Sequence, residues 1–517
     1  MHAPTLPADA PGSARPRPAI GLRGVALMGF GGALALTWGA WRVGALGDRR
    51  SRLRWLDGAP IVGSLPLPSR PLAYLLWGLG IALLSAAWVL LRRRTVAPGH
   101  GLTCGVVATM AGLWMLPLLL APPMGSRDVY SYVAHGELEA QGLDPGEVAP
   151  FDLGLTSPVL QGVDPVWRNV VSAYGPVNSG LSEAAVRLAR HDLERSVILW
   201  RLVAVGGVAL MALGVVALAR SGGRDPVDAL VLAVAGPLTV VQLIGGPHNE
   251  ALMAGLLACG LALGRTRSTG RAGASGLTLS WVGGVALCGL GAAVKAPALL
   301  GSVYLGWNQP GPDARWPARV ARTVVAGVIS LVVLALSSVV AGVGWGWLGG
   351  LSAGSNVTSL LSASTTLGLV AAWVLQQSTS LGTVVTGVRD VFLAASAVIA
   401  GVLLWRTPKL GLAGLAGALL VLAVMGPAVH PWYLTWCLPP AAVVLAGRRA
   451  DWAMVVAVVA AASTRPMGGG LVRNLGYFPL PMLLVLVAGA VAAWWFSRGS
   501  DRRRTAAPPS APTPASW

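Results

Sequence analysis

Long apolar segments recur along this chain, and they constrain its fold more than any other feature. Runs of about 18 to 25 mostly apolar residues follow one another, and that length spans a bilayer as an α-helix. Because lipid offers no water to stray backbone groups, helices are the favoured way to cross it. The composition agrees, with 54% hydrophobic residues, 11% charged residues and a mean hydropathy of +0.66. We therefore predict an all-α polytopic membrane protein.

The membrane domain is expected to cover residues 24–497, with about thirteen or fourteen transmembrane helices. Stretch 276–307 is interrupted by Lys295 and Pro297 and forms either one kinked helix or two short ones. Stretch 365–382 is only half apolar, which suits an interfacial or re-entrant segment. The expected spans are 24–45, 71–92, 102–121, 197–220, 227–245, 248–264, 276–291, 293–307, 321–343, 384–405, 409–428, 432–447, 452–464 and 480–497.

Two polar segments flank this membrane domain. Residues 1–23 are rich in Pro and Ala and are expected to form a disordered cytoplasmic leader rather than a cleavable signal. Residues 498–517 are basic and Pro-rich, so we expect a disordered cytoplasmic tail. The four cysteines lie in apolar segments and form no CxxC pair, so neither a metal site nor a disulfide framework is expected.

The chain is strongly basic, with a formal net charge of +18. Such a balance can indicate nucleic-acid binding, but here the arginines stand in short clusters between apolar runs, which is how membrane topology is encoded. We therefore expect no nucleic-acid partner and place the N-terminus in the cytoplasm. The loop 46–70 is an exception, because it is basic yet falls outside. The clusters expected inside are Arg92 to Arg94, Arg220 and Arg224, Arg265 to Arg271, Arg315 to Arg322, Arg406 with Lys409, Arg448 with Arg449, and Arg498 to Arg504.

The acidic residues are concentrated in one loop, 122–196. Ten of the chain's 20 acidic residues lie between Asp128 and Glu194. With the topology above, this loop and the other polar motifs all fall on the outer face of the membrane. A site assembled from them is therefore expected there. The other motifs are at 245–253, around Lys295, and at 345–359, 429–433 and 463–477.

Asp128 is the first candidate for chemistry. It follows an apolar run by a few residues, where neighbouring helices can shield a carboxylate that still acts as a base. Tyr130 and Tyr132 can hydrogen-bond a sugar or a phosphate, and Tyr132 shares a helix face with Asp128. The alternative is structural, because Asp is a good helix N-cap.

The motif GGPHNE at 245–250 is the second candidate. His248 and Asn249 can be donors at a helix N-terminus, which favours an anion. Glu250 can pair with a basic group. The alternative is a turn followed by a helix cap, because Gly-Gly-Pro breaks structure and Asn caps helices.

Lys295 is one of two lysines in the chain and interrupts an apolar run. An intramembrane cation is a functional candidate by default, although a lysine can also snorkel to the interface. Arg201, Arg389 and Arg465 are similar cases near outer helix ends.

Aromatic residues form the last group of candidates. His430, Trp432 and Tyr433 in VHPWYLTW belong either to an aromatic belt at the membrane interface or to a surface that stacks on a sugar ring. Tyr174 lies in SAYGPVNSG, a turn signal that by itself says little.

Five short motifs follow one another in a fixed order between the apolar runs: DVYSYVAHGELEAQGLDP, SAYGPVNSGL, GGPHNEALM, GAAVKAPALL and VHPWYLTWCLPP. In the order of these motifs the chain resembles the actinobacterial polyprenyl-phosphomannose-dependent α-1,6-mannosyltransferases, which build the mannan backbone of lipomannan and lipoarabinomannan in the cell envelope. The resemblance covers about residues 100 to 480. Glu250 departs from it, since Asp is more often expected there.

This resemblance implies a GT-C-like fold with a large outer loop carrying short helices, and an enzyme of the plasma membrane whose site faces outward. It implies a polyprenyl-phosphate-mannose donor, a mannan acceptor and an essential Asp, which Asp128 matches. We expect one inverting displacement with Asp128 as general base, and Lys295, Arg465, His248 and Arg201 near the donor phosphate. Sugar contacts are expected from Tyr130, Tyr132, Tyr174, Asn249, Glu250, His430, Trp432 and Tyr433.

No cofactor is expected, and the sequence leaves the need for a divalent cation open. Three other functions remain as alternatives: a transporter or flippase of polyprenyl-linked sugars, a GT-C transferase for another acceptor, and a non-catalytic membrane scaffold. The acidic outer loop argues against the transporter, and the intramembrane lysine argues against the scaffold.

Overall fold

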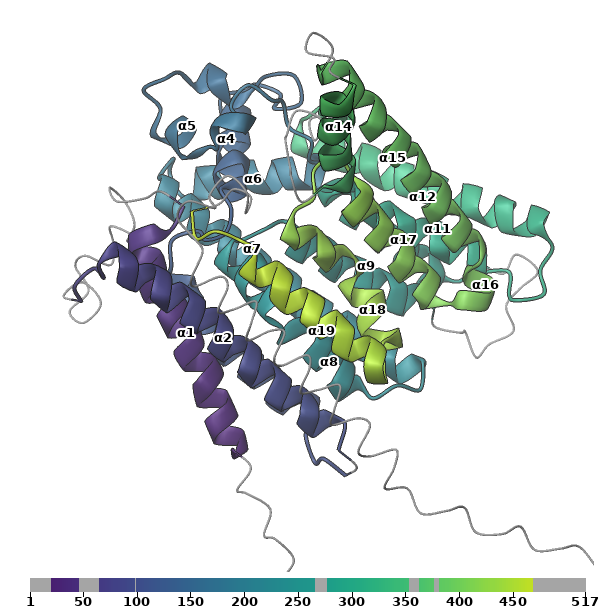
Figure 1. Cartoon of the computed structure of the whole chain (residues 1–517). Helices are drawn as coiled ribbons and strands as arrows, with labels where there is room; N and C mark the ends of the chain where they lie inside the picture. The colour runs from purple at the N-terminus through teal and green to yellow at the C-terminus, as the bar shows by residue number, and fades with distance from the viewer. Residues whose placement is uncertain are drawn as a thin grey trace, which may run out of the picture.

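The computed structural model describes residues 20–45, 65–97, 99–265, 277–352, 362–375 and 381–467. Every regular element in these ranges is helical, which confirms the all-α prediction (Figure 1). The expected leader and tail, and the expected span 480–497, lie almost wholly outside the described residues.

Five helices are long and apolar enough to cross a membrane by themselves. A sixth crossing is possible if α8 and η6, which meet at an angle of 52°, act as one broken span. The protein is therefore a multi-pass membrane protein, as expected. These elements are α1 (Leu22–Val43), α2 (Arg70–Thr95), α7 (Leu193–Ser221), α8 (Pro226–Val234), η6 (Leu238–Gly245), α12 (Trp316–Ala341) and α15 (Leu381–Trp405).

Other expected spans are represented in the described part of the chain by shorter apolar helices, which by length do not make full crossings by themselves. At 1.5 Å per residue, a helix of 16 residues is about 24 Å long and does not cover a core of about 30 Å. These helices are α3 (Cys104–Met115) with η3 (Leu116–Leu120), α9 (Glu250–Gly264), α10 (Leu279–Val294), α14 (Ala363–Val374) and α17 (Leu412–Met425).

Two open questions about the spans are answered by these bounds. Stretch 276–307 forms two short helices, because α10 ends at Val294 and α11 begins at Leu299. Stretch 365–382 contributes α14, which is too short to span and packs beside α15 (Figure 1). The remaining elements of this half are η7 (Ala296–Ala298), α11 (Leu299–Asn308), α13 (Trp347–Gly350), α16 (Thr407–Leu410), η9 (Pro431–Cys437), α18 (Leu438–Val444) and α19 (Gly447–Ala462).

The segments that join the helices gather at two opposite ends of the bundle. At the first, here called the basic end, Arg92 lies 2.9 Å from Asp228. Arg224 donates to the carbonyl oxygen of Leu445 there, at 3.2 Å. The acidic segment 122–196 lies at the other end, here called the loop end (Figure 1). These arginine-bearing segments therefore meet at one end, as the topology prediction requires.

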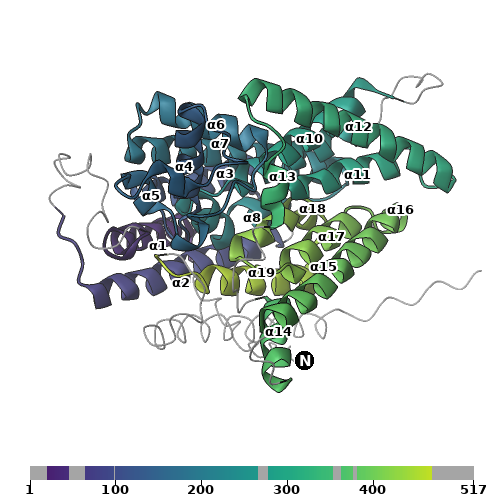
Figure 2. The same ribbon diagram turned by 90° about the horizontal axis from the view of Figure 1, so that it is seen from above.

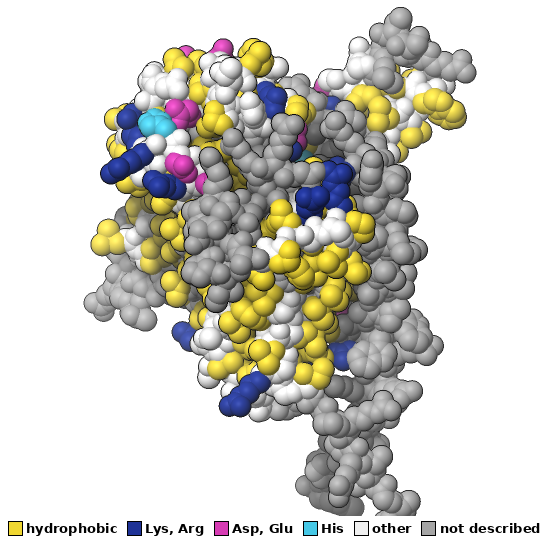
Figure 3. Space-filling view, turned by 90° about the vertical axis from the view of Figure 1, so that its left-hand side faces the viewer, with side chains coloured by type: hydrophobic (Ala, Val, Ile, Leu, Met, Phe, Trp, Pro, Cys, Tyr) yellow, Lys and Arg dark blue, Asp and Glu magenta, His cyan; other side chains and the backbone are white. Residues whose placement is uncertain are grey.

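The loop end is covered by a layer of short helices with its own core. It consists of α4 (Asp128–Ala140), η4 (Pro150–Leu153), α5 (Pro158–Gly162), η5 (Pro165–Trp167) and α6 (Pro176–Leu188). Viewed from above, this outer layer lies over one side of the bundle (Figure 2). Charged side chains gather over it, while the flank below is mainly hydrophobic (Figure 3). The expected large loop with short helices is confirmed.

Helices α7 and α9 pack at the distance that only glycine allows. A Cβ added to Gly207 would lie 2.4 Å from the backbone of Ala251, and one added to Gly255 would lie 2.3 Å from the carbonyl oxygen of Gly207. Small residues at such crossings let membrane helices approach closely. This contact matters for the site, because α9 begins next to His248.

We predict that Gly207→Ala destabilises the protein by about 1 to 3 kcal/mol, since the added methyl group forces the two backbones apart. The matched control is Gly206→Ala. Nothing lies within 4 Å of a Cβ at Gly206, and alanine favours a helix over glycine by up to about 1 kcal/mol. Thermal unfolding in detergent measures both. Equal melting temperatures for the two variants would contradict the close packing.

Candidate functional site

The predicted motifs meet at the loop end of the bundle, beneath the outer layer. Each comes from the end of a helix or from a break between helices, where side chains and backbone are not committed to helix packing. The contributing positions are Asp128 at the start of α4, Tyr174 before α6, His248 between η6 and α9, Glu250 at the start of α9, Lys295 between α10 and η7, and the segment from His430, just before η9, to Trp436 within it.

Asp128 is the first residue of α4, and its carboxylate does not cap that helix. The N-cap position is Arg127, which makes no side-chain capping bond. The hydroxyl of Ser126 accepts from the Asp128 backbone N–H at 3.0 Å. The N-cap interpretation of Asp128 is therefore wrong. The carboxylate is 14% exposed, so it remains reachable.

The environment of Asp128 raises its proton affinity. Burial raises the pKa of Asp128 from its ordinary value of 3.8 to about 6, the nearby Glu250 carboxylate also raises it, and the Lys295 ammonium opposes both. A carboxylate whose pKa lies near the working pH is suited to general base catalysis, because it is ionised yet accepts a proton readily.

His248 lies between two carboxylates. Its ring is fully buried, and its Nδ1 atom is 3.6 Å from Asp128 Oδ2 and 3.8 Å from Glu250 Oε2. Neither ring nitrogen has a hydrogen-bond partner. The sequence suggested His248 as a phosphate ligand, but two carboxylates beside Nδ1 do not form an anion site, so that assignment is not retained.

Lys295 and Glu250 form an ion pair at the break between α10 and α11. Glu250 is fully buried and Lys295 is 13% exposed. Three aromatic rings surround the ammonium, with Nζ 4.8 Å from the ring centroid of Tyr433, 5.4 Å from Tyr174 and 5.7 Å from Trp436. The expectation that Glu250 pairs with a basic group is confirmed, and the snorkelling alternative for Lys295 is wrong.

Trp432 is stacked between two imidazole rings. The ring centroid of His248 lies 4.2 Å from it at an interplanar angle of 22°, and that of His430 lies 4.4 Å away at 9°. Trp432 is 5% exposed, so it does not belong to an interfacial belt. Because both faces are covered, it cannot stack on a sugar either. Tyr433 stacks on Trp436 at 4.5 Å.

Two of the predicted sugar-binding tyrosines are core residues of the outer layer. Tyr130 is 2% exposed and lies against Gly162, where a Cβ would be 2.9 Å from the tyrosine ring. Tyr132 is fully buried and contacts the rings of Tyr174 and Trp200, at 5.0 and 4.9 Å. Tyr174 is half-buried and lies beside Lys295. Of the three, only Tyr174 retains both exposure and contact with the charged cluster.

Asn249 is the N-cap residue of α9, yet its side chain makes no capping bond. Its Nδ2 atom instead donates to Oδ1 of Asn178 at 2.8 Å, and both residues are buried. This bond ties α9 to α6. The sugar-binding role predicted for Asn249 is therefore replaced by a structural one.

Arg201 is also structural rather than a phosphate ligand. It is 1% exposed, and four of the five N–H groups that a guanidinium carries are engaged in hydrogen bonds. They donate at 2.7 to 3.3 Å to the backbone carbonyl oxygens of Leu119, Ala121, Ile244 and Gly245.

Arg465 follows α19 in a segment that packs against the approach to Asp128. The backbone N–H of Gly125 donates to the carbonyl oxygen of Pro466 at 3.0 Å, and Gln242 Nε2 donates to Thr464 Oγ1 at 2.6 Å. Arg465 itself is half-buried. Its segment therefore reaches the site from the last helix described.

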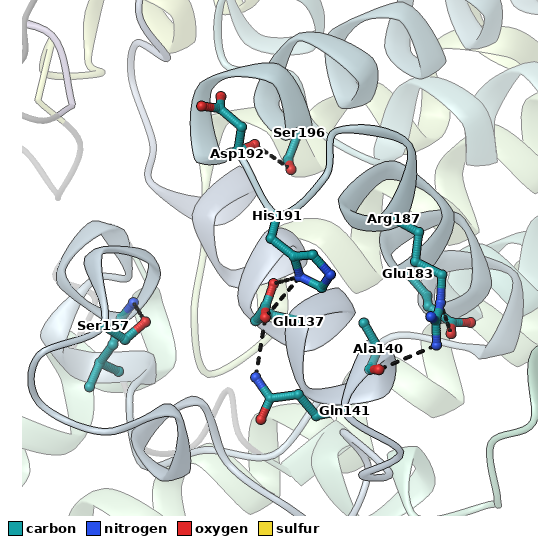
Figure 4. Close-up of polar contacts among 10 residues, drawn as sticks. Glu137, Ala140, Gln141, Ser157, Glu183, Arg187, His191, Asp192 and Ser196 are labelled. Carbon is teal, nitrogen blue, oxygen red and sulfur yellow. Dashed lines mark hydrogen bonds and ion pairs between the residues drawn. The ribbon is translucent and has the colours of Figure 1, made fainter.

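The orientation of α4 is held by polar contacts at its far end. His191 Nδ1 lies 2.9 Å from a carboxylate oxygen of Glu137, and Arg187 pairs with Glu183 at 2.7 Å while donating to the carbonyl oxygen of Ala140 at 3.3 Å (Figure 4). His191 has a φ of 61°, which is uncommon for a residue other than glycine. These contacts tie the far end of α4 to α6 and to the turn before α7.

Sequence reasoning missed three contributors. Trp436 could have been found, because its spacing from Trp432 and Tyr433 is that of one helix face. Ser126 and Asn178 carry no periodic signal, and their roles depend on partners that only the fold supplies.

Among the residues described, no group of three His, Cys, Asp or Glu side chains is placed to hold a metal ion.

Comparison with known proteins identifies the family. A family model described as "Alpha-(1->6)-mannopyranosyltransferase, N-terminal domain" matches residues 26–310, and one described as "MptB C-terminal domain" matches residues 362–498. Alpha-(1->6)-mannopyranosyltransferase A of Mycobacterium tuberculosis is 32% identical over 95% of this chain and 93% of its own length. Alpha-(1->6)-mannopyranosyltransferase B of Corynebacterium glutamicum is 28% identical over 80% of this chain and 72% of its own length. No solved structure matches.

These matches confirm the resemblance found in the sequence. They show that the chain is an enzyme, and not a transporter or a scaffold. The chain belongs to the alpha-(1->6)-mannopyranosyltransferase family and is a multi-pass membrane glycosyltransferase.

Proposed function

We propose that this enzyme moves mannose from polyprenyl-phosphate-mannose to a growing α-1,6-mannan of lipomannan or lipoarabinomannan, with Asp128 as the general base. The observation that carries the proposal is the pairing of a reachable, high-pKa carboxylate at Asp128 with an ammonium at Lys295 in one cluster. A base and a cation are what a displacement at a glycosyl phosphate needs.

The reaction is a single inverting displacement. The acceptor hydroxyl oxygen attacks the anomeric carbon of mannose, and the bond from that carbon to the phosphate oxygen breaks. The bonding electrons leave with the polyprenyl phosphate, and the hydroxyl proton passes to Asp128. A β-linked donor therefore gives an α-linked product. Phosphate leaves without an acid, so one carboxylate suffices.

Lys295 is the donor-phosphate ligand in this proposal. Its ammonium is partly exposed and is held by Glu250 and three rings. A preorganised cation stabilises the charge that develops on the leaving phosphate. Arg465 is the second candidate cation, because its segment packs beside Gly125. Tyr174, Tyr433 and His430 remain the proposed sugar contacts.

The site is proposed to face outward from the plasma membrane. Support comes from the arginine-bearing segments that meet at the basic end, opposite Asp128, because such segments favour the cytoplasmic side. On that outer face a lipid-linked sugar is a natural donor, since nucleotide sugars are confined to the cytoplasm. The α-(1->6) linkage in the relatives' names supports a mannan acceptor.

Asp128→Asn is predicted to lower transfer by about a hundredfold or more, which is the usual contribution of a general base. The shape of the side chain is kept and no capping bond is lost. The measurement is transfer of radiolabelled mannose from polyprenyl-phosphomannose to short α-1,6-mannosides in proteoliposomes. Asp152→Asn, at an exposed carboxylate of the outer layer, is the control. Wild-type transfer by Asp128→Asn would refute the base assignment.

The pH dependence of transfer follows from the raised pKa of Asp128. Because the base must be ionised, kcat/KM should be full at higher pH and fall as pH drops through about 6. A carboxyl group with the ordinary value of 3.8 would keep activity well below that pH. Rate profiles between about pH 4.5 and 8 test this. Activity that stays full down to about pH 4.5 would contradict the raised value.

Lys295 is predicted to bind the donor phosphate. Substituting Lys295 alone would leave the Glu250 carboxylate buried and unpaired, so the informative variant is Lys295→Gln/Glu250→Gln. Its donor affinity should be about tenfold to a hundredfold below that of Glu250→Gln, because a charged hydrogen-bonding group is lost. Lys409→Gln, at the chain's other lysine, is the charge control. Equal affinity in the two Glu250 variants would rule Lys295 out.

A further inference from the structure

The position of His248 between two carboxylates has a chemical consequence. Nδ1 is 3.6 Å from Asp128 Oδ2 and 3.8 Å from Glu250 Oε2. An ionised carboxylate only accepts hydrogen bonds, so two carboxylates beside Nδ1 favour the tautomer that carries the proton on Nδ1. Both separations exceed the 2.7 to 3.2 Å of a good N–H···O bond. A shift of about half an ångström would complete either bond.

The second acceptor is kept available by Lys295. One oxygen of Glu250 pairs with the Lys295 ammonium, and the other, Oε2, is fully buried and has no hydrogen-bond partner. Glu250 is thus held in place by one oxygen while its free oxygen faces His248. Asp128 is held differently, since its carboxylate is hydrogen-bonded by the neutral side chain of Ser126 and not by a charged group, and His248 Nδ1 stands 3.6 Å away.

The aromatic stack limits how His248 can move. Trp432 covers one face of the imidazole at 4.2 Å, and His430 supports the other face of the indole at 4.4 Å. Tyr433 in turn meets His430 edge to face at 5.1 Å. Stacked rings can slide or rotate within their planes, whereas tipping out of the plane would collide with a neighbour. The stack therefore restricts His248 to motion within the plane of its ring.

We propose that His248 is a positioning residue that alternates its Nδ1–H between Asp128 and Glu250, and that Trp432 backed by His430 confines it to that movement. While Asp128 is ionised, Nδ1–H donates to Oδ2 and orients the carboxylate toward the acceptor hydroxyl. When Asp128 takes the acceptor proton, the hydrogen bond passes to Glu250 Oε2. No proton leaves the imidazole. The inference rests on the proposed role of Asp128 as base.

The other charges around this pair are unchanged by substitution at His248 or Trp432. Lys295, Glu250 and Asp164 act on Asp128, and Lys295 and His430 lie within electrostatic reach of His248. A change in the pH profile of such variants therefore reports the lost hydrogen bond and not a lost charge.

The test is the acid limb of kcat/KM for mannosyl transfer. His248→Leu removes the donor that stabilises ionised Asp128, so the limb should move upward by about one to two pH units. His248→Asn places an amide N–H where Nδ1–H stands and should keep the limb near the wild-type position. Trp432→Ala should shift it upward as well, and Trp432→Ala/His248→Leu should shift it no further than His248→Leu.

Trp452→Ala is the matched control, because this tryptophan of α19 is 58% exposed and takes no part in the aromatic stack. Unshifted limbs in both His248→Leu and Trp432→Ala would overturn the proposal. If His248→Leu transfers too slowly to define a limb, His248→Asn must be at least about tenfold faster, and equal rates would overturn it. Failure of the base assignment would appear separately, as transfer that persists in Asp128→Asn.

Discussion

The buried guanidinium of Arg201 joins the two chain segments on which the site depends. A buried cation is costly unless its donors are satisfied, and the last carbonyl groups of a helix lack intrahelical partners and carry partial negative charge. The Arg201 guanidinium donates to such carbonyl groups, so its buried donors and their unpaired oxygens are satisfied together. One segment leads to Asp128 and the other to His248, so an interaction outside the site sets the spacing of its two central residues. The carbonyl groups belong to Leu119, Ala121, Ile244 and Gly245.

The charges of the site do not balance, because two carboxylates lie near a single ammonium group. The carboxylates of Asp128 and Glu250 lie within electrostatic reach of one ammonium, Lys295, which forms an ion pair with Glu250. The ion pair commits Lys295 mainly to Glu250, so its attraction does not offset the burial of Asp128, whose pKa rises to about 6. A donor phosphate drawn to Lys295 would weaken that attraction further and make Asp128 a stronger base. In the proposed reaction, binding of the donor and readiness of the base would therefore be coupled through Lys295.

Broken helices supply the positions at which this cluster forms. The gaps between α10 and α11, between η6 and α9, and between α17 and η9 all fall at the loop end. Unpaired backbone groups at such depth are tolerated only where protein or a water-filled cavity satisfies them. Here the turn before α6 packs into the first gap, where Gly175 donates to the carbonyl oxygen of Val294 and a Cβ on Gly175 would lie 2.4 Å from Ala293.

The sequence by itself determined the membrane-embedded all-α class, the family and the motifs that converge, because hydropathy, arginine placement and short polar motifs are local properties of the chain. It also indicated that Glu250 pairs with a positively charged side chain. It could not separate Asp128 as base from Asp128 as cap, and it misassigned Arg201, Tyr130 and Trp432. Those roles depend on which partners lie opposite each side chain, and the partners come from segments far apart in the chain. Only the packed structure decided that the N–H groups of Arg201 donate to backbone carbonyl groups, and that both faces of Trp432 are covered.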